Sequence, residues 1–305
     1  MATLNVSKMV ELEGHKDCIY ALAHGAQPYE FYTGGGDGWV VYWNLTEGAQ
    51  GQLIATFPTS IFSMTYFPAT NRMMVGLSKG GFYLLDLTEK TRVANFYKEH
   101  GIFDFRMIPG TSRMIVAGAK GHVHIVDAES FEEVAAFQVS SSNARKVNVS
   151  PDGKQFAIGF SDEQIRLFNA ETFELEEKFW GHQYSAFSVA YSPDERFLMS
   201  GGRDAQLRIW KRTAFGCQHY QTIPAHYFTI NDIVISPCQQ WMATGSRDKT
   251  IKVWDLERFA LFKVIDFKKL AGHKHSVNDM LWLTYGGYLV SASDDKTVKV
   301  WAIDE

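Results

Sequence analysis

Four groups of side chains in this sequence have the composition of a hydrolytic catalytic site. Each group consists of a His, a Ser or Thr 18 positions later, an Asp four positions after that hydroxyl residue and a Trp six positions after the Asp. In a nucleophilic triad an imidazole removes the proton of a hydroxyl group and a carboxylate orients the imidazole. The four groups are His15, Thr33, Asp37, Trp43; His182, Ser200, Asp204, Trp210; His226, Thr244, Asp248, Trp254; and His273, Ser291, Asp295, Trp301.

The regular repetition of these groups argues against catalysis. A reactive centre is needed once, whereas a constraint on every structural repeat recurs at the same spacing. A partly buried Asp or His is costly unless it is hydrogen-bonded, and a linked set contributes about 1 kcal/mol net per hydrogen bond. We therefore interpret the groups as structural braces and expect no catalytic residue.

Two other patterns also suggest chemistry at first sight. Residues 76–80 match the GxSxG pattern of hydrolases, but that motif needs a strand, a sharp turn and a helix, whereas another β-like run follows here. His122 and His124, like His273 and His275, would provide two metal ligands each, with no evident third ligand nearby. We expect no metal site and no cofactor.

Composition narrows the class of protein. Hydrophobic residues make up 46% of the 305 positions, which allows a large core. The 30 basic and 34 acidic side chains leave a net charge of −4, so nucleic acid is not the expected partner. Three cysteines without a CxxC pair favour a reducing compartment, and no apolar run has the length of a membrane span. We expect a cytoplasmic protein that does not bind membranes.

The elements that carry the four groups belong to a longer repeat. The same frame fits three units in the middle of the chain, where apolar residues replace most of the polar ones, as expected if a polar network is either complete or absent. The seven units have final positions 41 to 47 residues apart, close to the roughly 40 to 45 of a four-stranded propeller blade. These final positions are Trp43, Leu85, Val126, Phe168, Trp210, Trp254 and Trp301.

Each unit has an all-β pattern of alternating runs separated by turns. The last unit lacks a fourth strand, and the segment Lys8–Glu13 precedes the first His without a unit of its own. We predict that this segment completes the last sheet, which would remove an exposed edge. The predicted fold is all-β: a closed seven-bladed β-propeller with four antiparallel strands per blade, as a single domain spanning residues 1–305.

These repeats resemble the WD-repeat (G-beta-like) β-propeller family, with Trp254-Asp255 as the WD pair itself. The resemblance implies that the His, hydroxyl, Asp and Trp form a hydrogen-bonded tetrad. It also implies a non-catalytic scaffold that binds proteins or peptides on its top face. The lining positions of that face are three and five residues after the His and one before the Asp, which gives the candidates Tyr20, Phe62, Phe103, Arg145, Phe187, Arg203, Asn231, Arg247, Asn278 and Asp294.

The candidate top-face residues are unevenly distributed. Aromatic residues come from blades 1 to 3 and arginines from blades 4 to 6, with Phe187 among the latter. Because aromatics and Arg are enriched at binding hot spots, this predicts an aromatic half and a basic half that suit an acidic peptide with apolar anchors. The protein is expected to be monomeric by itself.

Three alternatives remain open. The aromatics can instead pack between blades while the arginines are solvated. A propeller enzyme would need several carboxylates or histidines among the lining residues, where only Asp294 is found. The cluster of arginines is consistent with an RNA-associated assembly subunit, but the net charge is not.

Overall fold

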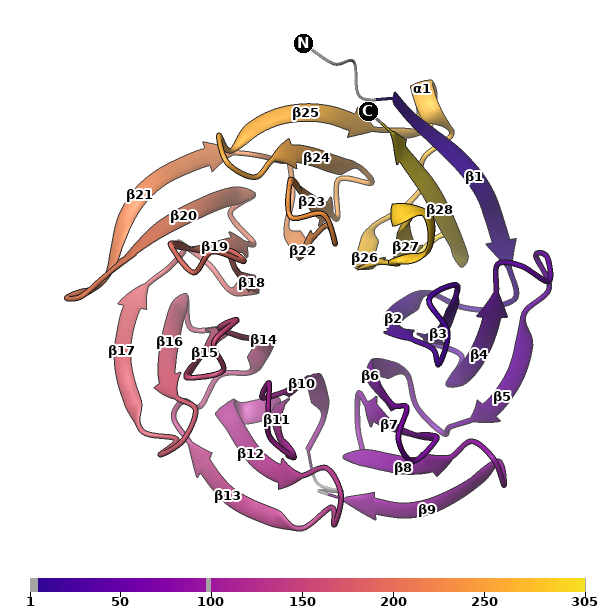
Figure 1. Cartoon of the computed structure of the whole chain (residues 1–305), viewed down its shortest axis with the longest axis horizontal. Helices are drawn as coiled ribbons and strands as arrows, with labels where there is room; N and C mark the ends of the chain where they lie inside the picture. Colours follow the sequence, from indigo (N-terminus) through magenta and orange to yellow (C-terminus); the bar gives the residue numbers. More distant parts are fainter. Residues whose placement is uncertain (1–4, 97–99, 305) are drawn as a thin grey trace. The chain divides into compact units, whose positions relative to one another are not determined.

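The chain forms seven four-stranded antiparallel sheets in the computed structural model, which describes residues 5–96 and 100–304 (Figure 1). These sheets are the blades, and they correspond to the seven units of the sequence. The chain divides into two compact units, Met1–Glu99 with Val234–Glu305 (the first unit) and His100–Ile233 (the second unit). The all-β fold class, a seven-bladed β-propeller, is confirmed. A single domain stays a prediction.

The blades of the second unit follow one another along the chain. They are blade 3 (β10 Ile102–Met107, β11 Arg113–Gly118, β12 His122–Asp127, β13 Glu133–Gln138), blade 4 (β14 Ala144–Val149, β15 Gln155–Phe160, β16 Gln164–Asn169, β17 Leu175–Trp180) and blade 5 (β18 Ala186–Tyr191, β19 Phe197–Gly202, β20 Gln206–Thr213, β21 Gly216–Pro224).

The other four blades have the same strand order. They are blade 1 (β2 Ile19–His24, β3 Glu30–Gly35, β4 Trp39–Asn44, β5 Gln52–Thr56), blade 2 (β6 Ile61–Phe67, β7 Arg72–Leu77, β8 Phe82–Asp86, β9 Thr91–Phe96), blade 6 (β22 Ile230–Ile235, β23 Trp241–Ser246, β24 Ile251–Asp255, β25 Ala260–Ile265) and blade 7 (β26 Val277–Trp282, β27 Leu289–Ser293, β28 Thr297–Asp304, with β1 Asn5–Glu13).

The second strand of each blade is almost fully buried, whereas outer strands such as β17 are more exposed. In β11 every residue after Arg113 is buried, while β17 alternates between exposed and half-buried positions along most of its length. The reason is that neighbouring blades within a unit pack against the inner strands: Ile115 and Ile125 of blade 3 share one cluster with Val147 and Phe156 of blade 4. Burying each such side chain contributes about 1.5–3 kcal/mol.

Tight turns join the first two strands of the blades. The Ser150 hydroxyl accepts a hydrogen bond from the Gln155 N–H at 3.0 Å, and Gly153 has a positive φ of 71°. Glu195 and Gln239 occupy the position of Gly153 in blades 5 and 6 and also have positive φ, 60° and 62°. The serine that opens each turn closes the hairpin, so the turn tolerates a non-Gly residue in a conformation that usually favours Gly.

The N-terminal strand completes blade 7, as predicted. β1 pairs antiparallel with β28, from Asn5 opposite Asp304 to Glu13 opposite Thr297. The strand begins three residues before the predicted segment and has a bulge between Lys8 and Val10.

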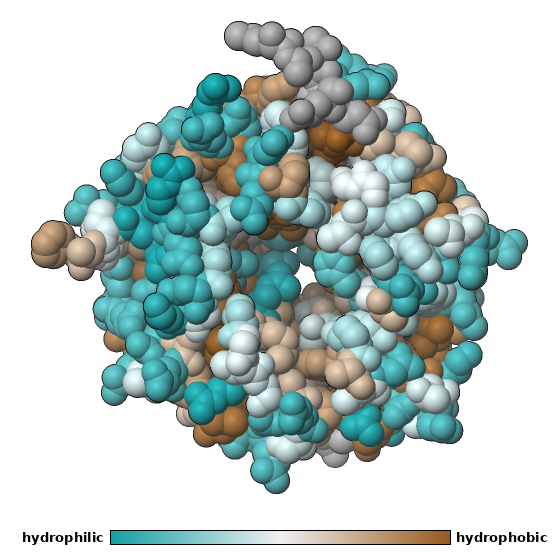
Figure 2. Space-filling model, in the orientation of Figure 1, coloured by the Kyte–Doolittle hydropathy of each residue, from teal (hydrophilic) through white to brown (hydrophobic). Residues whose placement is uncertain are grey.

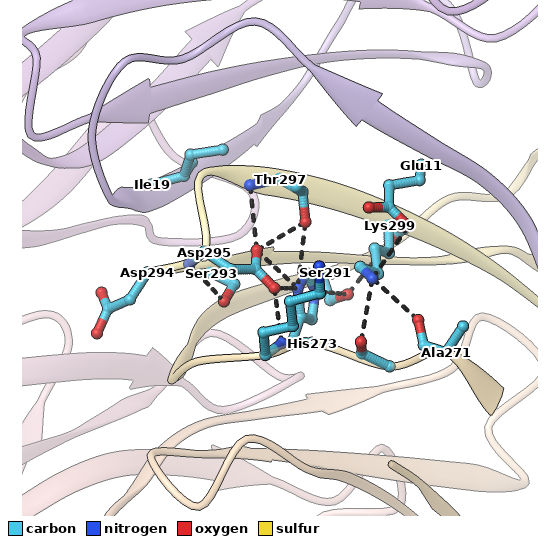
Figure 3. Close-up of polar contacts among 12 residues, drawn as sticks. Glu11, Ile19, Ala271, His273, Ser291, Ser293, Asp294, Asp295, Thr297 and Lys299 are labelled. Atoms are coloured by element: carbon cyan, nitrogen blue, oxygen red, sulfur yellow. Dashed lines mark hydrogen bonds and ion pairs between the residues drawn. The ribbon is translucent and has the colours of Figure 1, made fainter. Parts of the chain in front are cut away.

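A buried lysine reinforces this pairing. Lys299 of β28 is only 2% exposed, and its Nζ donates to the carbonyls of Ala271 and Gly272 at 2.9 and 3.0 Å (Figure 3). The same Nζ lies 3.1 Å from Oε2 of Glu11 on β1. Lys299 thus links β1, β28 and the loop that precedes blade 7.

Helical structure is minor in the described residues. The α-helix α1 (Phe267–Leu270) is capped by the Asp266 side chain, which accepts from the Lys269 N–H at 2.8 Å, and η1 (Ala119–Gly121) and η2 (Tyr285–Gly287) are single 3₁₀ turns. Within residues 5–96 and 100–304, no helix has the length and apolar character needed to cross a membrane.

Candidate partner-binding surface

The tetrad residues of blade 7 form a continuous hydrogen-bonded chain, of which Figure 3 shows His273, Ser291 and Asp295. His273 Nδ1 lies 3.0 Å from Asp295 Oδ2, and His273 Nε2 lies 2.8 Å from the Ser291 hydroxyl. The Trp301 indole N–H donates to the same hydroxyl at 3.0 Å. The four residue types therefore connect the loop before the blade to its second and third strands.

Blades 1 and 5 have the same arrangement. The imidazole-to-carboxylate distance is 3.1 Å for His15 and Asp37 and 2.8 Å for His182 and Asp204. The indole of the third strand donates to the hydroxyl at 2.9 Å in both blades, from Trp43 to Thr33 and from Trp210 to Ser200. In blade 6 the Trp254 indole donates to Thr244 at 2.9 Å, the Thr250 hydroxyl donates to Asp248 at 2.6 Å, and His226 is buried.

The electrostatics of the tetrads fit a neutral imidazole beside a carboxylate. Burial lowers the pKa of His273 below its usual value, as it does for His15 and His182. Burial alone would raise the pKa of Asp295, but hydrogen bonds from His273, Thr297 and the Lys274 N–H lower it. The neutral imidazole of His273 thus joins the Asp295 carboxylate through Nδ1 and the Ser291 hydroxyl through Nε2.

Each tetrad has the carboxylate, imidazole and hydroxyl in the order found in a serine hydrolase. Its hydroxyl, however, is not accessible to a substrate. The hydroxyl residues Thr33, Ser200 and Ser291 are all 0% exposed. A nucleophilic oxygen must contact its substrate, so these three groups act as braces.

Blade 4 departs from the expected pattern, because the turn carboxylate survives without the His. Asp162 accepts from the Ser140 hydroxyl at 2.6 Å and from both terminal nitrogens of Arg166 at 3.0 and 2.8 Å. The prediction that the polar network is either complete or absent is therefore wrong in this blade. A serine and an arginine satisfy the carboxylate in place of the imidazole.

One recurrent hydrogen bond brings two loops together at one end of blades 1 to 5 and of blade 7, and this end is here called the top end. The N–H of the residue before the turn Asp donates to the carbonyl of the residue three positions after the tetrad His. Blades 2 to 4 keep this bond without the His. The pairs are Gly36 and Cys18, Ser78 and Ser60, Ala119 and Gly101, Ser161 and Asn143, Arg203 and Ser185, and Asp294 and Ser276, at 2.6 to 3.0 Å.

In the first unit the top-end candidates contact one another. The rings of Tyr20 and Phe62 meet edge to face at 5.4 Å, and both side chains are half-buried. Burial raises the pKa of the Tyr20 hydroxyl. Asn278 donates to the Ile19 carbonyl and to Asp294 Oδ1, both at 2.8 Å, which satisfies part of that carboxylate. Arg247, also in this unit, is exposed.

In the second unit the candidates surround one arginine. The Arg145 guanidinium carbon lies over the rings of Phe103 and Phe187, 4.8 and 4.9 Å from their centroids, and its Nε–H donates to the Ser161 hydroxyl at 2.8 Å. Aromatic and basic residues are thus interleaved in this unit instead of forming the two expected halves. Arg203 is exposed, and Asn231 is half-buried.

Sequence comparison connects the tetrads with a family. The family model described as WD domain, G-beta repeat matches residues 6–44, 173–211, 217–255 and 266–302. These segments cover just over half of the chain, and they carry the residues of blades 1, 5, 6 and 7 with the tetrad pattern. The chain belongs to the WD-repeat family. No curated protein matches it.

The exposed aromatics of this WD-repeat chain are not the ones that the lining positions indicated. In the second unit Tyr184, Tyr227 and Phe228 are 57, 88 and 59% exposed. They stand one or two positions after His182 and His226, where blades 1 and 7 have Lys, Asp or His. A comparison of the four loops for apolar residues at otherwise polar positions would have identified them.

The remaining chemical patterns lie in a turn of blade 2 and on strand β12 of blade 3. Ser78 of the GxSxG pattern lies in a turn that leads into strand β8, as expected. His122 stacks on His100 at 4.1 Å between ring centroids, and His124 Nδ1 lies 2.8 Å from Glu133 Oε2. Burial lowers the pKa of His122 and of His124. The part of the chain that the structure describes has no group of three or more His, Cys, Asp or Glu arranged for a metal ion.

Proposed function

We propose that this WD-repeat chain is a non-catalytic scaffold that binds an acidic protein segment with apolar anchors at the top ends of its blades. WD-repeat propellers commonly bind protein partners. The observation that carries the proposal is the group of exposed aromatics Tyr184, Tyr227 and Phe228 in the unit that also holds Arg145 and Arg203. Exposed aromatics and arginines are the residue types that are enriched at binding hot spots.

The charges at these top ends support an acidic partner. Neither Arg145 nor Arg203 forms an ion pair with a carboxylate of the described residues, whereas Lys146, which follows Arg145, lies 3.1 Å from Asp232. Two arginines without internal counter-ions favour a negatively charged segment and disfavour a basic one. The proposal includes a cytoplasmic setting, which rests on the free cysteines Cys18, Cys217 and Cys238.

The alternatives have less support. For a propeller enzyme, the top-end candidates offer one carboxylate, Asp294, which is hydrogen-bonded to Asn278. For an RNA-associated subunit, the two arginines would favour RNA binding, but the net charge of −4 disfavours it.

A loop variant with a matched control tests the proposal. Tyr184, Tyr227 and Phe228 are replaced together by Ser, and the control replaces Phe215 and Tyr220 by Ser. The two control residues are 95 and 55% exposed and lie on the β20–β21 hairpin, which projects in Figure 1 and bears hydrophobic atoms in Figure 2. Both variants should fold, as measured by circular dichroism, because the replaced side chains are exposed.

Peptides are then selected with the wild-type protein from a random library displayed on phage. We expect the loop variant to lose binding of the enriched peptides by about tenfold or more, and the control to keep it. Enriched peptides without acidic residues, or equal losses in both variants, would contradict the proposal.

A further inference from the structure

Arg145 is held rigidly at the top end of blade 4. Its guanidinium lies over rings from blade 3 (Phe103) and blade 5 (Phe187), and its Nε–H donates to Ser161 of its own blade at 2.8 Å. Contacts of a cation with two ring faces and one hydroxyl restrict the rotamers of a long side chain. The conformational cost of ordering Arg145 is therefore met before any ligand binds.

The charge of Arg145 has no internal counter-ion. Its terminal nitrogens make no hydrogen bond or ion pair with the residues that the structure describes. Nearby cations are paired, since Arg166 binds Asp162 through two hydrogen bonds and Lys146 lies 3.1 Å from Asp232. Burial without a carboxylate also lowers the pKa of Arg145. A half-buried cation in this state gains more from an incoming anion than a solvated one does.

The free groups of this guanidinium suit a carboxylate. The guanidinium already lies over two aromatic rings, and its Nε–H already donates to Ser161. The terminal NH₂ groups therefore remain for a ligand. A planar guanidinium binds a carboxylate through two parallel hydrogen bonds. Phosphorylated motifs are typically bound by clusters of arginines, whereas a single arginine, Arg145, contacts both Phe103 and Phe187. The site therefore favours a carboxylate over a phosphate.

A run of hydrogen bonds connects Arg145 with an exposed aromatic. The Ser161 carbonyl accepts from the Ser185 hydroxyl at 3.3 Å, and the Ser185 carbonyl accepts from the Arg203 N–H at 2.9 Å. Tyr184, which is 57% exposed, precedes Ser185 directly. Two hydrogen bonds and one peptide step therefore separate Arg145 from Tyr184.

We propose that Arg145 binds an Asp or Glu side chain of the partner segment, and that an apolar residue near this acid contacts Tyr184. This inference rests on the proposed function and deepens it, because it assigns one acidic contact to one residue. Arg203, which is exposed, would contribute less because water and salt screen its charge.

A double-mutant cycle between protein and peptide tests the assignment. The probe is the best acidic peptide from the phage selection, synthesised with its Asp or Glu and with the corresponding Asn or Gln, and binding is measured by fluorescence anisotropy. In wild-type protein we expect the amide peptide to bind about tenfold or more weakly than the acid. The acid-to-amide ratio is the affinity for the acid peptide divided by the affinity for the amide peptide. In Arg145→Met this ratio should fall to about one, because the acid peptide should bind this variant only as weakly as the amide peptide binds wild type.

Two further variants control for fold and for charge. Arg113→Met changes an arginine of the same unit, whose guanidinium carbon lies 5.4 Å from the centroid of the Phe173 ring. Arg113 is the first residue of β11, at the other end of this strand from Ala119 and the top end of blade 3. This variant should keep the full acid-to-amide ratio. Arg145→Lys keeps the charge but not the paired hydrogen bonds, so its ratio should lie between those of wild type and Arg145→Met.

The outcomes separate this inference from the proposed function. An unchanged ratio in Arg145→Met and Arg145→Lys, or tighter binding of the phosphoserine version of the peptide, would overturn the Arg145 assignment while leaving the peptide surface in place. If no peptide is enriched, or if the loop variant of Tyr184, Tyr227 and Phe228 binds normally, the proposed function fails and the assignment fails with it.

Discussion

At the scale of single residues, a buried hydroxyl serves two partners in each intact tetrad. The Ser291 hydroxyl bonds to His273 Nε2 at 2.8 Å and accepts from the Trp301 indole at 3.0 Å, and Ser291 is 0% exposed. Blade 3 has Val116 at the equivalent position, so a blade also folds with an apolar residue there. What a blade does not tolerate well is a buried polar group whose partner has been removed.

Ser291→Ala should therefore destabilise the fold. It leaves two buried nitrogen groups without their partner, each at about 1–3 kcal/mol, so we expect a loss of about 2–6 kcal/mol in the free energy of unfolding. Urea unfolding followed by circular dichroism measures this loss.

The double variant Ser291→Ala with Trp301→Phe provides the control. Trp301→Phe removes one of the two orphaned groups, so the combined loss should be smaller than the sum of the two single losses. Strictly additive losses would show that the hydroxyl and the indole do not depend on each other.

At the scale of elements, the pairing of β1 with β28 is reinforced by the Glu11–Lys299 contact. Glu11 receives two lysines, Lys8 at 2.6 Å and Lys299 at 3.1 Å, of which only Lys299 is buried. Burial alone would raise the pKa of Glu11, but the two lysines lower it. The buried lysine also satisfies the carbonyls of Ala271 and Gly272, which no other described side chain bonds.

These two lysines should differ greatly in their effect on stability. Lys299→Ala leaves Glu11 and two carbonyls without their buried donor, with an expected loss of about 3–5 kcal/mol in the free energy of unfolding. Lys8→Ala removes a more exposed pair and should cost about 0–1 kcal/mol. Chemical denaturation of both variants measures the difference, and equal losses would contradict the role of Lys299 as a link between β1 and the loop.

The strands could be predicted from the sequence because their causes are local. Apolar alternation, turn serines such as Ser150 and the repeat period specify each blade over 41 to 47 residues. Contacts that depend on distant residues could not be predicted. Lys299 is buried by carbonyls 27 and 28 positions earlier in the chain, and Arg145 meets rings 42 positions away on either side. The spacing rule located Arg145 at the top end, but its contact with the two rings depends on the rotamers of Arg145, Phe103 and Phe187.

At the scale of the whole molecule, the two ends of the chain meet in one sheet. The sequence predicted this, because the last unit lacked a fourth strand and residues 8–13 had no unit of their own. In the structure β1 adds Val6 and Leu12, which are 2 and 1% exposed, to the clusters that blade 7 forms. The other six blades instead receive their fourth strand through a direct turn from the third.

A circular permutant tests this difference in connectivity. The permutant begins at Gly14, ends at Glu13 and joins the original C-terminus to the original N-terminus through a short Gly/Ser linker. Because Asn5 lies opposite Asp304, β1 would then follow β28 as an ordinary hairpin. We expect a folded monomer by size-exclusion chromatography, with a thermal midpoint within about 5 °C of wild type, since the contacts are unchanged. Deletion of residues 1–13 should instead give aggregated protein, because it exposes the edge of β28 and the apolar residues that β1 covers. A deletion variant that folds as well as the permutant would show that β1 is dispensable for blade 7.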